Sequence, residues 1–188
     1  MDFDYFNFKS NNKVTKGSLI LSQPLMKDLN FKRSIILICE HNIEGSYGYK
    51  LNDKLNHRSI MSDLNKNIKE NLYVGGPVDN SYLNFIHNSN QIKDSVEITN
   101  DIFLGGDLDV VLENNINNFK VKFFSGYSGW STNQLENEIK ENSWIVINDY
   151  ISNFIFDEID EKFWTSFLSD KGGKNKIFSN YPKDPSLN

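Results

Sequence analysis

The sequence has a single cysteine, Cys39, which lies among isoleucine and leucine in the stretch Ser34–Asn42. One thiol excludes an internal disulfide and any metal site built from several cysteines. A thiol among aliphatic side chains is typical of a small core residue rather than a reactive nucleophile. The scarcity of cysteine fits a reducing compartment, and we therefore predict a cytoplasmic protein.

Arginine is almost as scarce, because the chain has only Arg33 and Arg58, and the net charge is −5 at pH 7. Phosphate binding depends on a basic surface, and arginine is the commonest side chain that reads guanine edges. These shortages disfavour direct binding to nucleic acid.

Long apolar runs are absent as well, since no stretch approaches the roughly 20 apolar residues of a membrane-spanning helix. The first residues, MDFDYFNFKSNN, are acidic and aromatic, whereas a secretory signal is basic and then apolar. We expect neither a membrane segment nor a signal peptide, which again predicts a cytoplasmic location.

Aromatic residues are plentiful, with 14 Phe, 8 Tyr and 3 Trp among 188 residues. A chain of this length can bury a core of its own. The sequence has no internal repeat, low-complexity block or linker. We predict a mobile lead-in over residues 1–16 and one domain over residues 17–188.

Short strand and helix patterns alternate irregularly, which predicts an α+β fold. Ser34–Asn42 is apolar on both of its alternating faces and is predicted to be a central strand covered on both sides. Gly45–Asn52 follows it as a hairpin partner. Further strands are expected within residues 17–24, 71–80, 81–89, 101–104, 118–130 and 143–151; a helix or loop within 53–70; and helices after Asp107, from Ser131 and over 156–173.

Three adjacent polar residues, Glu40, His41 and Asn42, close the strongest strand. They are either a hydrogen-bonded strand end or part of a polar pocket. Successive strand residues point to opposite faces, so Glu40 and His41 can serve one substrate together only if the strand bulges.

The sequence contains no complete pattern for a metal site or a nucleophile. The histidines His41, His57 and His87 lack the short spacings of zinc ligands, and we predict neither metal nor cofactor. Ser128 lies in GYSGW, which has Trp130 where a nucleophile elbow has its final glycine, so the motif disfavours a serine nucleophile.

Two glycine pairs interrupt strand patterns, in Gly75-Gly76-Pro77 and in Gly105-Gly106-Asp107. Each could offer backbone N–H groups to an anion, but neither has the lysine and hydroxyl residue of a phosphate loop. We interpret them as turns, with Asp107 as the N-cap of the following helix.

The stretch SGYSGWSTNQLENEI, from Ser125 to Ile139, has the spacing of a capping box between Ser131 and Gln134. This predicts a strand-to-helix corner. Tyr127 and Trp130 are not explained by helix initiation. Their rings either pack on the core or stack on a ligand at a rim.

Four blocks in order resemble the YqgE/AlgH family of bacterial proteins: GSLILSQPLMKDLNFKRSIILICEHNIEGSYGYKLN, YVGGPV, FLGGD and FFSGYSGWSTNQLENEIKENSW. The match runs from Gly17 to the last predicted helix, and one departure is Ser46, where the family often has alanine. The resemblance implies a bifurcated mixed sheet curled into a pseudo-barrel with helices outside. Members are often labelled transcriptional regulators, and no biochemical activity is established for the family.

These observations favour a non-enzymatic binding or regulatory module, monomeric or weakly dimeric, that acts through a protein or small-molecule partner. The alternatives are a hydrolase with Glu40 or His41 as general base and, against the net charge, a regulator that binds DNA directly. The binding residues we expect are Arg33, Glu40, His41, Asn42, Gly75, Gly76, Pro77, Tyr127, Gly129, Trp130 and Gln134.

Overall fold

The computed structural model describes residues 13–55, 64–113, 119–170, 176, 177, 179 and 180. The elements in chain order are β1 (Leu19–Ser22), β2 (Ile35–Asn42), β3 (Gly45–Lys50), α1 (Lys66–Glu70), β4 (Leu72–Val74), β5 (Val78–His87), β6 (Val96–Thr99), β7 (Ile102–Leu104), α2 (Leu108–Glu113), β8 (Val121–Ser131), α3 (Gln134–Lys140), β9 (Trp144–Ile147), a 3-10 helix (Ser152–Phe156) and α4 (Glu161–Asp170).

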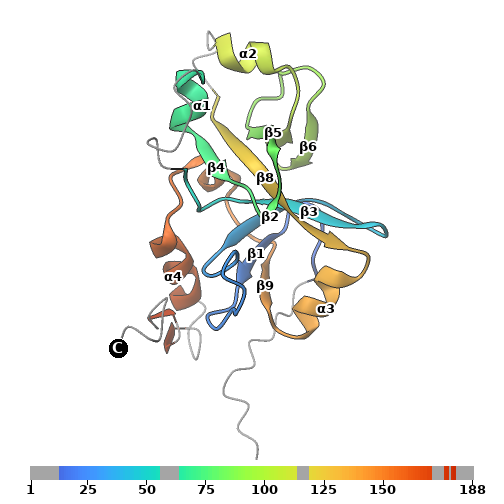
Figure 1. Cartoon of the computed structure of the whole chain (residues 1–188), viewed down its shortest axis with the longest axis vertical. Coiled ribbons are helices and arrows are strands. Elements are labelled where there is room, and N and C mark those ends of the chain that lie inside the picture. Colours follow the sequence, from blue (N-terminus) through green and yellow to red (C-terminus); the bar gives the residue numbers. More distant parts are fainter. Residues whose placement is uncertain (1–12, 56–63, 114–118, 171–175, 178, 181–188) are drawn as a thin grey trace, which may run out of the picture.

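Nine strands within the described ranges form one mixed sheet with the order β6-β7-β5-β8-β3-β2-β1-β9, and β4 also pairs with β8. The long strand β8 is the fork of this sheet. Its first half pairs with β5 and, in parallel, with β4, whereas Ser128–Ser131 pair with β3. The α+β class and the bifurcated sheet are therefore confirmed (Figure 1).

The hairpin of β2 and β3 lies where the sequence predicts it, and β2 is central, between β1 and β3. The two faces of β2 enter different cores. Ile35, Leu37 and Cys39 pack in one cluster, while Ile36 and Ile38 pack in another. The prediction of a strand covered on both sides is confirmed.

The two arms of the sheet curl around a shared interior core. Leu37 and Ile147 of one arm pack in the same cluster as Ile86 and Phe124 of the other. The arms approach each other at Gly17, where a Cβ would lie 2.7 Å from Cβ of Thr99. The sheet does not close, because β6 and β9 are the two ends of the strand path.

The helices pack around this frame (Figure 1). Leu135 of α3 covers the outer face of the β1–β2–β9 arm, and Ile68 of α1 and Val111 of α2 cover the outer face of the β4–β5–β8 arm. Trp164 and Leu168 of α4 pack against the shared interior core.

Three helix predictions can be compared with the observed boundaries. The carboxylate of Asp107 accepts the backbone N–H groups of Asp109 and Val110, so the predicted N-cap of α2 is confirmed. The last helix begins at Glu161, not within Phe156–Ile159, because Asp160 accepts the N–H groups that open it. The expected element within 53–70 is observed as α1, and residues 56–63, with His57 and Arg58, lie outside the described residues.

The N-terminal segment is described from Lys13 onward, and residues 1–12 of the predicted lead-in lie outside the described residues. Val14 is 4% exposed and packs with Ile20. Among the described residues, no helix is long and apolar enough to cross a membrane.

Candidate functional site

The strand-to-helix corner within Ser125–Ile139 differs in detail from its prediction. Strand β8 continues through Ser131, and Asn133, with φ of 61°, precedes α3. Gln134 Oε1 accepts the Ser131 N–H at 3.0 Å, as a capping box requires. The Ser131 hydroxyl, however, also donates to Gln134 Oε1 rather than accepting a helix N–H, so the reciprocal half of the predicted box is wrong.

Trp130 is a core residue, with 6% of its surface exposed. It packs edge-on against Trp144, with ring centroids 5.8 Å apart. The Glu138 carboxylate accepts both indole N–H groups, at 2.9 Å from Trp130 and 2.7 Å from Trp144. Of the two alternatives for this ring, the structure selects core packing.

Tyr127 projects from the other face of β8 and is half-buried. Its ring lies across Gly129, where a Cβ would come within 3.1 Å of Tyr127 Cε2. It also meets Tyr47 of β3 edge-on, with centroids 6.2 Å apart and planes at 80°. Gly129 therefore leaves room for the Tyr127 ring, which faces a cleft.

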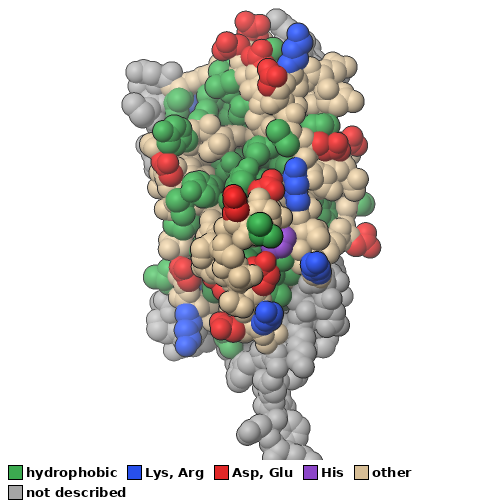
Figure 2. Space-filling view, turned by 90° about the vertical axis from the view of Figure 1, so that its right-hand side faces the viewer, with side chains coloured by type: hydrophobic (Ala, Val, Ile, Leu, Met, Phe, Trp, Pro, Cys, Tyr) green, Lys and Arg blue, Asp and Glu red, His purple; other side chains and the backbone are tan. Residues whose placement is uncertain are grey.

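The cleft consists of two hollows that share the side chains of Tyr47 and Tyr127. The larger has a volume of about 530 Å³ and the smaller about 350 Å³. Tyr49, Asp79, Tyr82, Asn84 and Leu104 complete the smaller hollow, and Glu40, Asn42, Glu44, Gly45, Ser46, Val78, Gly129, Trp130 and Ser131 complete the larger. We call both hollows together the tyrosine cleft. Figure 2 shows the face from which the β2–β3 hairpin projects, where hydrophobic side chains gather among charged ones.

Glu40 and His41 lie on opposite faces of β2. Glu40 pairs across the hairpin with Tyr47 and lines the cleft. His41 pairs with Ser46, and its Nδ1 lies 2.7 Å from Ser46 Oγ while its Nε2 lies 3.7 Å from Glu136 Oε1. The hairpin has a bulge between Ile38 and Glu40, before both residues, so it does not bring them to one face.

Gly75, Gly76 and Pro77 connect β4 to β5 directly over the backbone of β8. A Cβ on Gly75 would lie 2.3 Å from the Gly126 carbonyl oxygen, and one on Gly76 would lie 2.3 Å from the Tyr127 carbonyl. These glycines are therefore required by close backbone contact. They support the strand that carries Tyr127, and none of the three lines the cleft.

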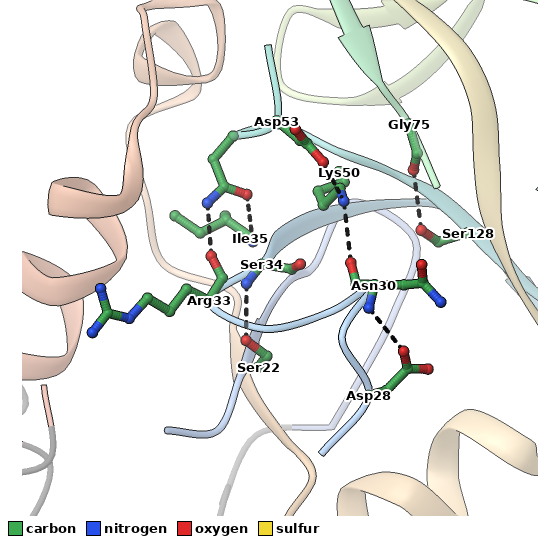
Figure 3. A network of polar contacts seen from close by, with 11 residues as sticks. Ser22, Asp28, Asn30, Arg33, Ser34, Ile35, Lys50, Asp53, Gly75 and Ser128 are labelled. Atoms are coloured by element: carbon green, nitrogen blue, oxygen red, sulfur yellow. Dashed lines mark hydrogen bonds and ion pairs between the residues drawn. The ribbon is translucent and has the colours of Figure 1, made fainter. Parts of the chain in front are cut away.

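Arg33 lies apart from the cleft, beside α4, with its guanidinium 5.5 Å from the Trp164 ring centroid. Figure 3 shows the polar network around its loop. Asn52 donates to the Arg33 carbonyl at 2.7 Å and accepts the Ile35 N–H, and Lys50 donates to the Asn30 carbonyl at 3.1 Å. The network holds the loop between β1 and β2 in place.

The candidate nucleophiles Ser128 and Cys39 are buried, and neither is in a reactive state. Ser128 is fully buried and donates to the Gly75 carbonyl at 3.0 Å. Burial raises the pKa of the Cys39 thiol, so the thiol stays protonated.

His87, one of the histidines considered as metal ligands, is also buried, with Nε2 2.9 Å from the Gly105 carbonyl. Among the described residues, no group of three His, Cys, Asp or Glu side chains is arranged to hold a metal.

The phenols of Tyr47 and Tyr49 remain neutral. Burial raises the pKa of Tyr47, and the neighbouring Cys39 and Glu40 act in the same direction. Burial likewise raises the pKa of Tyr49. Both rings therefore offer uncharged π faces and O–H groups at physiological pH.

The sequence did not single out several residues of the cleft, among them Tyr47, Tyr49, Asp79, Tyr82 and Asn84. Tyr47 and Tyr49 alternate along β3, and Tyr82 and Asn84 alternate along β5, so each pair shares a sheet face. That alternation is the only sequence signal, and it is equally typical of core strands.

Fold and site together define a single-domain α+β protein with a forked sheet and an open aromatic cleft on one sheet face. A sequence model of the AlgH-like family matches residues 19–176. The chain belongs to the AlgH-like family.

Its relatives are similar over nearly their full length. A UPF0301 protein of Cytophaga hutchinsonii is 39% identical over 183 residues, which are 93% of this chain and 100% of the relative. A UPF0301 protein of Bacteroides fragilis is 34% identical over 194 residues, which are 98% of this chain and 97% of the relative.

Two solved structures share the fold. Protein DIP2367 of Corynebacterium diphtheriae matches with a TM-score of 0.74 and 21% identity, over 96% of this chain and 100% of that one. The AlgH protein of Pseudomonas aeruginosa matches with a TM-score of 0.67 and 20% identity, over 91% of this chain and 98% of that one.

Proposed function

We propose that this chain is a cytoplasmic, non-enzymatic binding module whose partner occupies the tyrosine cleft. The observation that carries the proposal is the shared wall of Tyr47 and Tyr127 between two hollows of about 530 and 350 Å³. Aromatic side chains with one open face supply large contact area at low entropic cost. Any regulatory role would then act through a protein or small ligand, with the module itself a monomer or weak dimer.

The exposed rim of the cleft supports a protein partner in particular. Tyr82 is 68% exposed at the smaller hollow, and Val78 is 37% exposed at the larger. Exposed apolar and aromatic side chains that gather at one place are typical of interaction surfaces. The acidic net charge of −5 favours a partner other than nucleic acid.

Site-specific photo-crosslinking tests this proposal. A benzophenone amino acid replaces Tyr82 in one variant and Ile151, which is 78% exposed outside the cleft, in the control. We expect one dominant adduct from position 82 in cells, suppressed by excess unlabelled protein, and none from position 151. Equal labelling from both positions would contradict a role for the cleft.

A small ligand is tested in a separate arm by thermal unfolding with pooled metabolites. Stabilisation of the natural protein that disappears in Tyr127→Leu places the ligand in the cleft. Stabilisation that persists in Tyr127→Leu would place it elsewhere. Absence of both photo-adducts and ligand stabilisation would refute the binding function.

The second candidate is a hydrolase, and one contact favours it. The His41 ring lies between Ser46 and Glu136, with Nδ1 next to Ser46 Oγ and Nε2 facing the Glu136 carboxylate. This is the spatial order of a nucleophile, a base and an orienting acid. We rank it second because Ser46 is 8% exposed and the His41–Glu136 distance of 3.7 Å exceeds a hydrogen bond. A fluorophosphonate probe that labels the natural protein but not Ser46→Ala would establish this candidate in place of the first.

A further inference from the structure

The wall of the tyrosine cleft is an arrangement of aromatic rings from three strands. Tyr47 and Tyr49 come from β3, Tyr82 from β5 and Tyr127 from β8. Tyr47 meets Tyr49 with planes at 79° and Tyr127 with planes at 80°. Rings in near-perpendicular, edge-to-face contact form a continuous wall that presents both ring edges and π faces to the cleft.

The phenol groups of this wall are available to a ligand. Within the described part of the chain, no hydrogen bond joins the hydroxyl groups of Tyr47, Tyr49, Tyr82 or Tyr127 to another residue. Tyr49 is 3% exposed, so its side chain is buried in the protein while lining the smaller hollow. Its hydroxyl can therefore bond with water or with a ligand that enters the hollow.

Among the described residues, the charges that line the cleft have one sign. Glu40 and Glu44 line the larger hollow and Asp79 the smaller, and no described lysine or arginine lines either one. Within the described residues, none of these three carboxylates forms an ion pair. Lys16 is close enough to act electrostatically on Cys39, but it lines a separate small hollow beside Gly17 and not the tyrosine cleft.

Neutral aromatic rings combined with carboxylates are complementary to an organic cation, which is attracted to both the π faces and the negative charges. Two exposed side chains, Val78 in the larger hollow and Tyr82 in the smaller, stand at the edge of the cleft. A partner segment therefore finds a cationic site and, beside it, apolar surface for its neighbouring residues.

We propose that the tyrosine cleft binds an extended segment of a partner protein through a lysine or arginine side chain. The cationic head lies against the wall formed by the Tyr47 and Tyr127 rings, in the hollow that Glu40 also lines, and the flanking residues lie over the rim at Tyr82. This inference rests on the binding function proposed above and names the chemistry of its ligand.

The test measures retention of the natural protein by pools of random nonapeptides on beads. The central residue is arginine, lysine, citrulline or glutamate. Citrulline has the shape of arginine without its charge. Since a cation–π contact and a nearby carboxylate each contribute modestly, we expect about tenfold stronger retention on the arginine and lysine pools than on citrulline. We also expect this preference to weaken as salt is raised.

Three variants assign the preference to the cleft. Glu40→Gln preserves the shape of a half-buried side chain while removing its charge, and Tyr127→Leu removes one ring of the aromatic wall. Both variants should lose the preference. Glu70→Gln, at an exposed residue of α1 that pairs with Lys66, should retain it. Thermal unfolding establishes whether each variant folds. If Tyr127→Leu does not fold, Glu40→Gln alone still decides the test.

The other outcomes overturn the inference. Equal retention on the arginine and citrulline pools would refute recognition of a cation. Binding of spermidine to the cleft, without retention on any pool, would refute a peptide ligand. Retention on no pool, together with photo-adducts from position 82, would refute the cationic ligand and leave the binding function standing. Loss of the adducts as well would refute both.

Discussion

The indole N–H of Trp130 donates to the Glu138 carboxylate at 2.9 Å and thereby fastens β8 to the helix that follows it. The same oxygen accepts the indole N–H of Trp144 from β9 at 2.7 Å. Gln134 Nε2 donates to the other oxygen at 2.9 Å. One carboxylate therefore joins two strands and a helix, with both indole rings in the core.

Replacing Glu138 tests this joint. In Glu138→Leu, two buried indole N–H groups lose their acceptor, and we expect the free energy of unfolding to fall by about 2–4 kcal/mol. Glu138→Gln retains one acceptor oxygen and should cost about 1 kcal/mol. Urea denaturation followed by tryptophan fluorescence measures both. Glu141→Gln, at an exposed residue, is the control and should change stability by less than about 0.5 kcal/mol.

Lys122 is a buried cation, 1% exposed, with Nζ 4.3 Å from the Tyr73 ring centroid. Burial, reinforced by Lys54, lowers its pKa to about 7. The unfolded chain binds this proton up to about pH 10.4, so this group makes stability rise between pH 7 and that value. We expect Lys122→Met to be more stable than the natural protein by about 1–4 kcal/mol at pH 7.

The difference between Lys122→Met and the natural protein should shrink as the pH approaches the unfolded pKa of about 10.4, since removing the lysine's proton on folding then costs progressively less. Urea denaturation at several pH values provides the comparison. A variant that is less stable by the same amount at every pH would show that the cation contributes through its contacts with Tyr73 and the Leu51 carbonyl.

His87 should make the stability of the folded protein depend on pH in the acidic range. Burial lowers its pKa, although its contact with the Gly105 carbonyl opposes the shift. Below the ordinary histidine pKa of about 6.5, the unfolded chain gains a proton that the folded protein resists, so stability falls with acid. We expect a shallower loss in His87→Gln than in the natural protein between about pH 7 and 5. Parallel pH dependence of the two would contradict a neutral, buried His87.

Gly76 and Gly105 are a matched pair of glycines. A Cβ on Gly76 would lie 2.3 Å from backbone atoms of Tyr127, whereas one on Gly105 would meet nothing within 4 Å. We expect Gly76→Ala to lower the free energy of unfolding by about 2–4 kcal/mol, because β8 cannot move away. Gly105→Ala should cost only the left-handed backbone strain at φ of 66°, about 1 kcal/mol. Similar melting temperatures for both variants would refute the close contact.

Local patterns predicted the features that depend on local physics. The two apolar faces of β2 and the N-cap at Asp107 are set by residues within one strand or one helical turn. The start of α3 was misplaced for a related reason. Ser131 has a capping side chain, but its backbone is held in the sheet by Gly45, so the helix begins only after Asn133.

The site depends on pairings that no local pattern contains. Tyr47 and Tyr127 are 80 positions apart and meet because β3 pairs with β8. Sequence alternation places Tyr47 on one face of its strand, but only the sheet decides whether that face is covered. The sequence left open whether the Trp130 ring packs on the core or on a ligand for the same reason. Its burial follows from α3 folding back over β8.

The fork at β8 has a consequence for the order of events during synthesis. Residues 121–131 join the two arms of the sheet. Trp144–Ile147 then complete one arm by pairing with Leu19–Ser22, which are made more than a hundred positions earlier. An emerging chain can form the β2–β3 hairpin early, because its partners are adjacent. The cleft must wait until the ribosome has released the forking strand, so folding of this protein is dominated by late, long-range closure.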